Sequence, residues 1–124
     1  MTVIAITGLV GQGKTVFLSY LAHKISNEKK MPIYANYHLK GSKSFNDLGD
    51  NKGVILAIDE ASEISYENQK ENILILTAQD VKKLNLPEDA MVFSVSRKDD
   101  KIFSSLGDEI SLKQYLHLNL SGMK

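Results

Sequence analysis

The sequence contains no cysteine, and Arg97 is its only arginine. The absence of cysteine excludes disulfide bonds, zinc sites built from thiolates and cysteine nucleophiles. It gives no sign of an oxidising compartment, so we expect a cytoplasmic location. A single arginine also argues against the arginine-rich lid with which a small kinase clamps a transferring phosphoryl group.

Neither sign of charge is in excess, because 15 basic residues balance 15 acidic residues. No overall positive field therefore draws nucleic acid to the chain, and any contact with DNA depends on a local patch. Long apolar runs are missing as well, since none approaches the roughly 18 residues that a membrane-spanning helix needs. The first residues, MTVIAITG, lack the basic segment of a signal peptide. We therefore expect a soluble protein without a membrane segment.

The composition that is present is that of an ordinary globular domain. Hydrophobic residues make up 43% of the chain and charged residues 24%, which indicates neither disorder nor a fibrous protein. A length of 124 residues suits one domain that buries roughly two-thirds of the surface of its unfolded chain. We therefore expect a single domain over residues 1–124.

Five short apolar runs, bounded by glycine or polar residues, predict buried strands. They lie at residues 2–7, 33–37, 54–58, 73–76 and 91–95. An alternating polar and apolar segment at 114–120 predicts one additional half-exposed strand near the C-terminus.

The segments between these runs are helical or polar. Apolar residues near helical spacing predict a helix over 14–27, and the polar stretch 61–71 predicts a short second helix. Residues 41–53 are rich in Gly, Ser, Asn and Asp, which favours a surface loop, and 96–100 favours a polar hairpin-like segment. Strands separated in this way imply a mostly parallel five-stranded α/β sheet covered on both faces.

The segment GLVGQGKT at residues 8–15 fills the fixed positions of the phosphate-binding loop GxxxxGK[S/T], between a predicted strand and a predicted helix. Glycines let the main-chain N–H groups approach an anion, the helix N-terminus adds partial positive charge, and the lysine adds a full charge. We therefore expect the phosphates of a nucleotide to contact Gly8, Gly11, Gln12, Gly13, Lys14, Thr15 and Val16.

Two carboxylates, Asp59 and Glu60, end the apolar run at 54–58. Together with the hydroxyl of Thr15, the carboxylate of Asp59 is predicted to hold Mg²⁺. Glu60 is predicted to polarise the attacking water, which a hydrolase needs and a small-molecule kinase does not. The alternative is that Glu60 only begins the next helix, where the helix dipole favours an acid.

Two further polar residues are candidates for catalysis beside Lys14. Gln79, at the end of the fourth run, would face the terminal phosphate as a sensor of hydrolysis, or else serve only to begin the next helix. Arg97 would complete the transition-state charge from a neighbouring subunit, or else be a solvated charge in a turn. Asn36 lies near the end of the second run, at the same edge of the sheet, and its role stays open.

Four segments, taken in order, resemble the additional-strand, catalytic-glutamate (ASCE) division of P-loop ATPases. They are GLVGQGKT, IYANYHL, VILAIDEAS and ILILTAQ. Within it they are similar to HerA/FtsK-type DNA motors, which include viral DNA-packaging ATPases, and to zonula-occludens-toxin-like phage assembly ATPases. The resemblance covers about residues 1–100. It implies a three-layer fold with strand order 5-1-4-3-2 and helices on both faces, with Glu60 as base and Gln79 as sensor.

The leading hypothesis is therefore ATP binding and hydrolysis with Mg²⁺. The resemblance adds that a homo-oligomer would drive DNA translocation or packaging, or virion assembly, with DNA or a viral structural protein as partner. ATP is favoured over GTP because no NKxD-like base-reading segment is present. Two alternatives are an ATP-binding regulatory module with little turnover and, less favoured, a small P-loop kinase.

Overall fold

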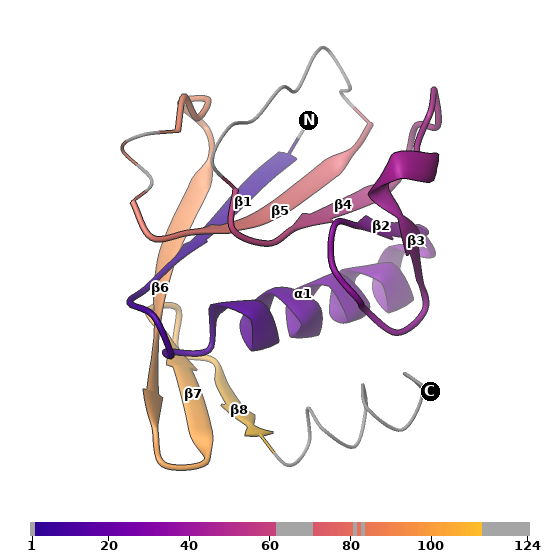
Figure 1. Ribbon diagram of the computed structural model, residues 1–124. Helices are drawn as coiled ribbons and strands as arrows, with labels where there is room; N and C mark the ends of the chain where they lie inside the picture. The colour runs from indigo at the N-terminus through magenta and orange to yellow at the C-terminus, as the bar shows by residue number, and fades with distance from the viewer. Residues whose placement is uncertain (1, 62–70, 81, 83, 113–124) are drawn as a thin grey trace.

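The computed structural model of the chain describes residues 2–61, 71–80, 82 and 84–112. These residues form eight strands, one α-helix and one 3₁₀ helix (Figure 1). In chain order they are β1 (Thr2–Thr7), α1 (Lys14–Lys29), β2 (Ile33–Ala35), β3 (Ser42–Ser44), η1 (Phe45–Asp47), β4 (Ile55–Ile58), β5 (Ile73–Ala78), β6 (Met91–Lys98), β7 (Lys101–Ser104) and β8 (Glu109–Ser111).

All eight strands belong to one mixed sheet in the order β3-β2-β4-β5-β1-β6-β7-β8. The pairs from β3 to β6 are parallel, whereas β6–β7 and β7–β8 are antiparallel. In Figure 1, α1 lies along one face of the parallel part, and β7 and β8 extend the sheet beside the start of the helix. The parallel part therefore brings the carboxyl ends of β1, β4 and β5 to one edge.

The expected fold class, a three-layer α/β fold with a five-stranded sheet and helices on both faces, is wrong. The described residues have one α-helix, which covers one face, and three strands beyond the five expected. Connections between parallel strands usually contain a helix, but residues 79–90 carry Asn85 and Pro87 and form no α-helix where they are described. On the face of the sheet opposite α1, the apolar side chains of Leu84, Leu86 and Ala90 pack against the strands instead of a helix.

The additional strands were missed for different reasons: β3 is polar, and β7 and β8 are short strands with one buried side chain each, Ile102 and Ile110. β3 has the polar sequence SKS and largely exposed side chains, so its pairing with β2 rests on main-chain hydrogen bonds. β7 exists because β6 is eight residues long and only its first half pairs with β1. The second half, Val95–Lys98, pairs antiparallel with β7 after a two-residue turn at Asp99 and Asp100.

The core forms on both faces of the central strands, as the alternation of side chains along a strand requires. On the α1 face, Phe17 and Leu18 of the helix are fully buried against a cluster that includes Ile6 and Ile75. On the other face, Leu74 and Leu76 of β5 pack with Val3 and Ala5 of β1. Because β1 and β5 are buried on both sides, the loops that follow them start from rigid positions.

Two expectations lie outside the described residues: most of the short helix at 61–71 and the whole strand at 114–120. Within the described part of the chain, no helix is both long and apolar enough to cross a membrane.

Candidate functional site

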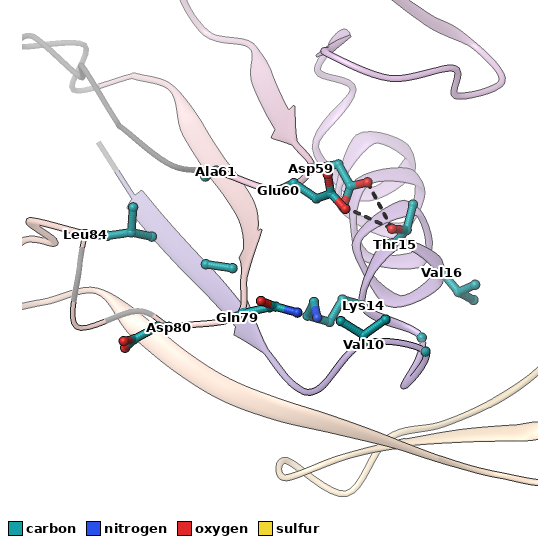
Figure 2. A pocket seen from close by; sticks show the side chains of 13 residues that line it. Val10, Lys14, Thr15, Val16, Asp59, Glu60, Ala61, Gln79, Asp80 and Leu84 are labelled. Carbon is teal, nitrogen blue, oxygen red and sulfur yellow. Dashed lines mark hydrogen bonds between the residues drawn. The ribbon is translucent and has the colours of Figure 1, made fainter.

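A cavity of about 630 Å³ lies at the carboxyl edge of the parallel strands. Its volume is in the usual range for a small-molecule site, roughly 300–1,000 Å³. The loop after β1, the acidic turn after β4 and the residues after β5 converge on it (Figure 2). The lining residues are Val10, Gly11, Gly13, Lys14, Thr15, Val16, Asp59, Glu60, Ala61, Ala78, Gln79, Asp80 and Leu84.

The glycine loop enters α1 through Gly13, the N-cap residue of the helix, whose φ of 91° lies in the left-handed region. A side chain there would be strained, and its Cβ would lie 2.8 Å from Cγ1 of Ile102 and still closer to Cδ1. The first turn of α1 contains no acidic residue. The positive end of the helix dipole therefore faces the cavity without a carboxylate from its own first turn.

Lys14 is the only basic residue that lines the cavity, within the part of the chain that the structure describes. Its Nζ donates to the carbonyl oxygens of Gly8 at 2.7 Å and Leu9 at 3.3 Å. These bonds hold the ammonium group of Lys14 against the glycine loop. The lysine thus places a positive charge beside the main-chain N–H groups of the loop.

Thr15 and Asp59 meet directly across the cavity wall. The Thr15 hydroxyl lies 3.0 Å from both Oδ1 and Oδ2 of Asp59, as Figure 2 shows. Mg²⁺ prefers oxygen ligands and needs only one or two carboxylates when phosphates and waters complete its shell. The described residues contain no cluster of three or more His, Cys, Asp or Glu that could hold a metal alone. The pair therefore fits Mg²⁺ that arrives with a phosphate ligand.

Two neighbouring strands hold the turn that carries Asp59. From the β2 side, Asn36 makes a double hydrogen bond: its Oδ1 accepts from the Asp59 N–H at 2.7 Å, and its Nδ2 donates to the Asp59 carbonyl at 3.0 Å. From β5, the Thr77 hydroxyl donates to Asp59 Oδ1 at 2.7 Å. Sequence reasoning left Asn36 without a role and missed Thr77, although a lone hydroxyl in the apolar run ILILTA was a usable signal.

Glu60 has an exposed side chain at the cavity wall and an unusual main chain. Its φ of 55° lies in the left-handed region, which non-glycine residues seldom adopt. The Glu60 N–H donates to the Thr77 hydroxyl at 2.8 Å, and the next N–H, of Ala61, donates to the Thr77 carbonyl at the same distance. The carboxylate is therefore accessible while its main chain is fixed.

Gln79 lines the same cavity, and Figure 2 shows its side chain directed toward Lys14. Its carbonyl accepts from the Thr7 hydroxyl at 3.3 Å, which ties the end of β5 to the end of β1. Asp80 follows as a third carboxylate of the lining, and its Oδ1 accepts from the Lys82 N–H. Sequence reasoning did not single out Asp80.

Three predicted residues do not line the cavity. Gly8 lies beneath the loop, where an added Cβ would be 2.9 Å from the Val95 carbonyl oxygen. The side chain of Gln12 turns outward, and its Oε1 accepts from the Arg97 N–H at 2.9 Å. Arg97 itself is exposed, and its Nε donates to the Asp99 carbonyl. The remaining predicted residues line the same cavity: Gly11, Gly13, Lys14, Thr15, Val16, Asp59, Glu60 and Gln79.

Searches with protein-family models, among curated proteins and among solved structures found no match to this chain.

Proposed function

We propose that the chain binds ATP together with Mg²⁺ and hydrolyses it. The observation that carries the proposal is the convergence of Lys14, the Thr15–Asp59 pair and Glu60 on one cavity. A lysine beside a glycine loop can bind phosphates, and a hydroxyl with a carboxylate can ligate Mg²⁺. An exposed carboxylate can act as a general base.

In the proposed reaction, the glycine loop and Lys14 bind the phosphates and orient the terminal phosphorus. The Glu60 carboxylate accepts a proton from a water molecule, whose oxygen bonds to that phosphorus as the bond to the bridging oxygen breaks. ADP and inorganic phosphate leave, and the proton on Glu60 returns to solvent. Thr15 and Asp59 would hold Mg²⁺, which would supply positive charge to neutralise the phosphate oxygens. In this proposal the Gln79 amide hydrogen-bonds the terminal phosphate or the water.

A second candidate is an ATP-binding regulatory module with little turnover. It is favoured because the described lining of the cavity contains three carboxylates and only one basic residue, Lys14. The only arginine, Arg97, is not among the lining residues. A monomer without a further cation is expected to stabilise the transition state poorly.

For the same reason we propose that turnover requires a homo-oligomer, in which Arg97 of a neighbouring copy supplies the missing cation. The resemblance to DNA-packaging and phage assembly ATPases extends this to movement of DNA or of a viral structural protein in the cytoplasm. These partners rest on the resemblance.

The decisive experiment measures phosphate release with Mg²⁺ and ATP over a range of protein concentrations, with and without single- and double-stranded DNA. Glu60→Gln is the test variant, and Glu28→Gln, an exposed acid near the far end of α1, is the matched control. Loss of a general base typically costs about 10²–10⁴-fold in rate. We expect Glu60→Gln to lose turnover and keep ATP binding, and Glu28→Gln to retain both.

Binding is measured separately, by titration with ATP and Mg²⁺, using Lys14→Ala against the exposed control Lys52→Ala. Binding that Lys14→Ala weakens, without turnover in any condition, would favour the regulatory module. Binding of equal strength in all four variants, or none in the parent chain, would reject the proposed site.

A further inference from the structure

Thr77 is a fully buried polar residue on β5, a strand whose other side chains are all apolar. Burying a hydroxyl group is unfavourable unless its hydrogen bonds are satisfied. The Thr77 hydroxyl makes two: it accepts from the Glu60 N–H at 2.8 Å and donates to Asp59 Oδ1 at 2.7 Å. One hydroxyl therefore contacts both residues of the acidic turn.

The contact with Asp59 fixes one oxygen of its carboxylate. Thr15 approaches both carboxylate oxygens at 3.0 Å, so it does not by itself distinguish Oδ1 from Oδ2. The shorter bond from Thr77 reaches Oδ1 alone. Thr77 thus sets the rotation of the carboxylate about its last bond and leaves Oδ2 with Thr15 as its only described partner.

The contact with Glu60 fixes its main chain. A left-handed conformation at a non-glycine residue persists only where the surroundings hold it. At Glu60 the φ of 55° is held by the Thr77 hydroxyl, and the following residue, Ala61, is held by the Thr77 carbonyl at 2.8 Å. Residue 77 therefore determines the direction in which the Glu60 side chain leaves the turn.

We propose that Thr77 is a positioning residue that sets the Asp59 carboxylate and the Glu60 main chain in one fixed relation, and so couples Mg²⁺ binding to the general base. The inference rests on the proposed function for its catalytic consequence. It gives a positioning role to Thr77, near the carboxyl end of β5, beside the sensor role predicted from the sequence for Gln79, which follows the strand.

The test compares Thr77→Val, which keeps the shape and removes the hydroxyl, with Thr77→Ser, which keeps the hydroxyl. Thr2→Val, at the exposed start of β1, is the matched control. The first measurement is hydrogen exchange of the Glu60 amide by NMR, which needs no nucleotide. We expect faster exchange in Thr77→Val, and exchange close to that of the parent chain in Thr77→Ser and Thr2→Val.

The second measurement is the Mg²⁺ concentration that half-saturates ATP hydrolysis. The kcat of hydrolysis and the affinity for ATP in the absence of Mg²⁺ are measured alongside it. Loss of a group that orients a metal ligand typically costs roughly 10–100-fold in metal affinity or activity, so we expect Thr77→Val to raise half-saturating Mg²⁺ by about tenfold or more. ATP affinity without Mg²⁺ should not change, whereas a merely structural defect would lower it as well. Thr77→Ser should restore the Mg²⁺ response.

The outcomes separate the two proposals. If the parent chain hydrolyses ATP and Thr77→Val shows the same Mg²⁺ response, the positioning role is wrong and the proposed function stands. If the parent chain binds no ATP, the proposed function is wrong, and exchange at Glu60 still decides whether Thr77 holds the turn. If Thr77→Val does not fold, Thr77→Ala replaces it, and an unchanged Glu60 amide in that variant would overturn the inference.

Discussion

The parallel and antiparallel parts of the sheet differ in how their polar residues are used. In the parallel part, β1, β4 and β5 are largely buried, and apart from Thr2 their polar side chains lie near the carboxyl ends, the edge where the cavity is. In the antiparallel part, β6, β7 and β8 carry exposed side chains along their length. The parallel part therefore concentrates the chemistry, whereas the antiparallel part is organised around packing and turns.

The two parts meet at the glycine loop. Ile102 of β7, which is fully buried, packs against Gly13. The Gln12 side chain accepts a hydrogen bond from the Arg97 main chain on β6. The loop that is expected to bind phosphate is thus supported from outside by strands that supply no lining residue to the cavity. Substitutions at this junction test whether the antiparallel part matters to the site.

The largest effect is expected from Ile102→Ala, which leaves a void beside Gly13. Truncating a buried isoleucine costs about 2–5 kcal/mol of unfolding free energy, so we expect about 4 kcal/mol here. Urea denaturation followed by circular dichroism measures the change. Leu106→Ala, at a side chain 67% exposed in the next turn, is the control and should change stability little. Equal losses in both variants would show that β7 is not part of the core.

The next effect is expected from Gly13→Ala. The added Cβ meets Ile102, and the residue must keep a left-handed conformation. Strain and overpacking together are expected to cost about 3 kcal/mol. Gly11→Ala is the control, because its φ of 80° is also left-handed but nothing lies within 4 Å of the added Cβ. A loss in Gly11→Ala as large as that in Gly13→Ala would mean that main-chain strain, and not contact with β7, limits the loop.

A smaller effect is expected from Gln12→Ala, which removes the 2.9 Å hydrogen bond to the Arg97 N–H. A single exposed hydrogen bond contributes about 0.5–1.5 kcal/mol, so we expect a loss near 1 kcal/mol. Amide exchange at Arg97, read by NMR, should accelerate. Gln79→Ala should leave that amide unchanged, because the Gln79 side chain lies on the cavity side of the loop. An unaltered Arg97 amide in Gln12→Ala would remove this link between the two parts.

The smallest effect is expected from Glu109→Gln, which breaks the exposed salt bridge between Lys101 and Glu109, 2.7 Å apart on β7 and β8. The hydrogen bond from Lys101 to Glu109, and then their charge attraction, raise the pKa of Lys101 above its ordinary 10.5. A lysine whose pKa is raised by folding stabilises the fold at pH values below its ordinary pKa. This stabilisation is lost as the pH rises through the raised pKa. Parent and variant should therefore differ slightly in stability at neutral pH and converge in strong alkali. A difference that grows with pH would contradict this.

The candidate site was largely readable from the sequence because its residues lie at strand ends, where local patterns place them. Gly13, Lys14 and Thr15 follow β1 directly, and Asp59 and Glu60 follow β4, so parallel pairing alone brings them to one edge. Thr77 was not read in this way, because it lies within the apolar sequence of β5 and belongs to no motif that would link it to Asp59 and Glu60. Its role depends on the register of β5 against β4.

The fold was less readable. Buried runs marked the central strands, but β3 is polar, and β7 was expected only as a segment after a turn. The expectation of helices on both faces followed from a general rule for parallel sheets and from the resemblance. It failed for the described residues because the connection before β6 covers its face with separate apolar side chains.

By itself, the sequence determined the glycine loop, the helix that follows it, the acidic turn and the buried central strands, because each depends on neighbouring residues. Only the tertiary structure decided that Thr77 holds Asp59 and Glu60, that Ile102 closes on Gly13, and that Arg97 lies outside the cavity lining. These contacts join residues far apart in the chain. They depend on strand register and on the antiparallel return of β7, which local patterns do not specify.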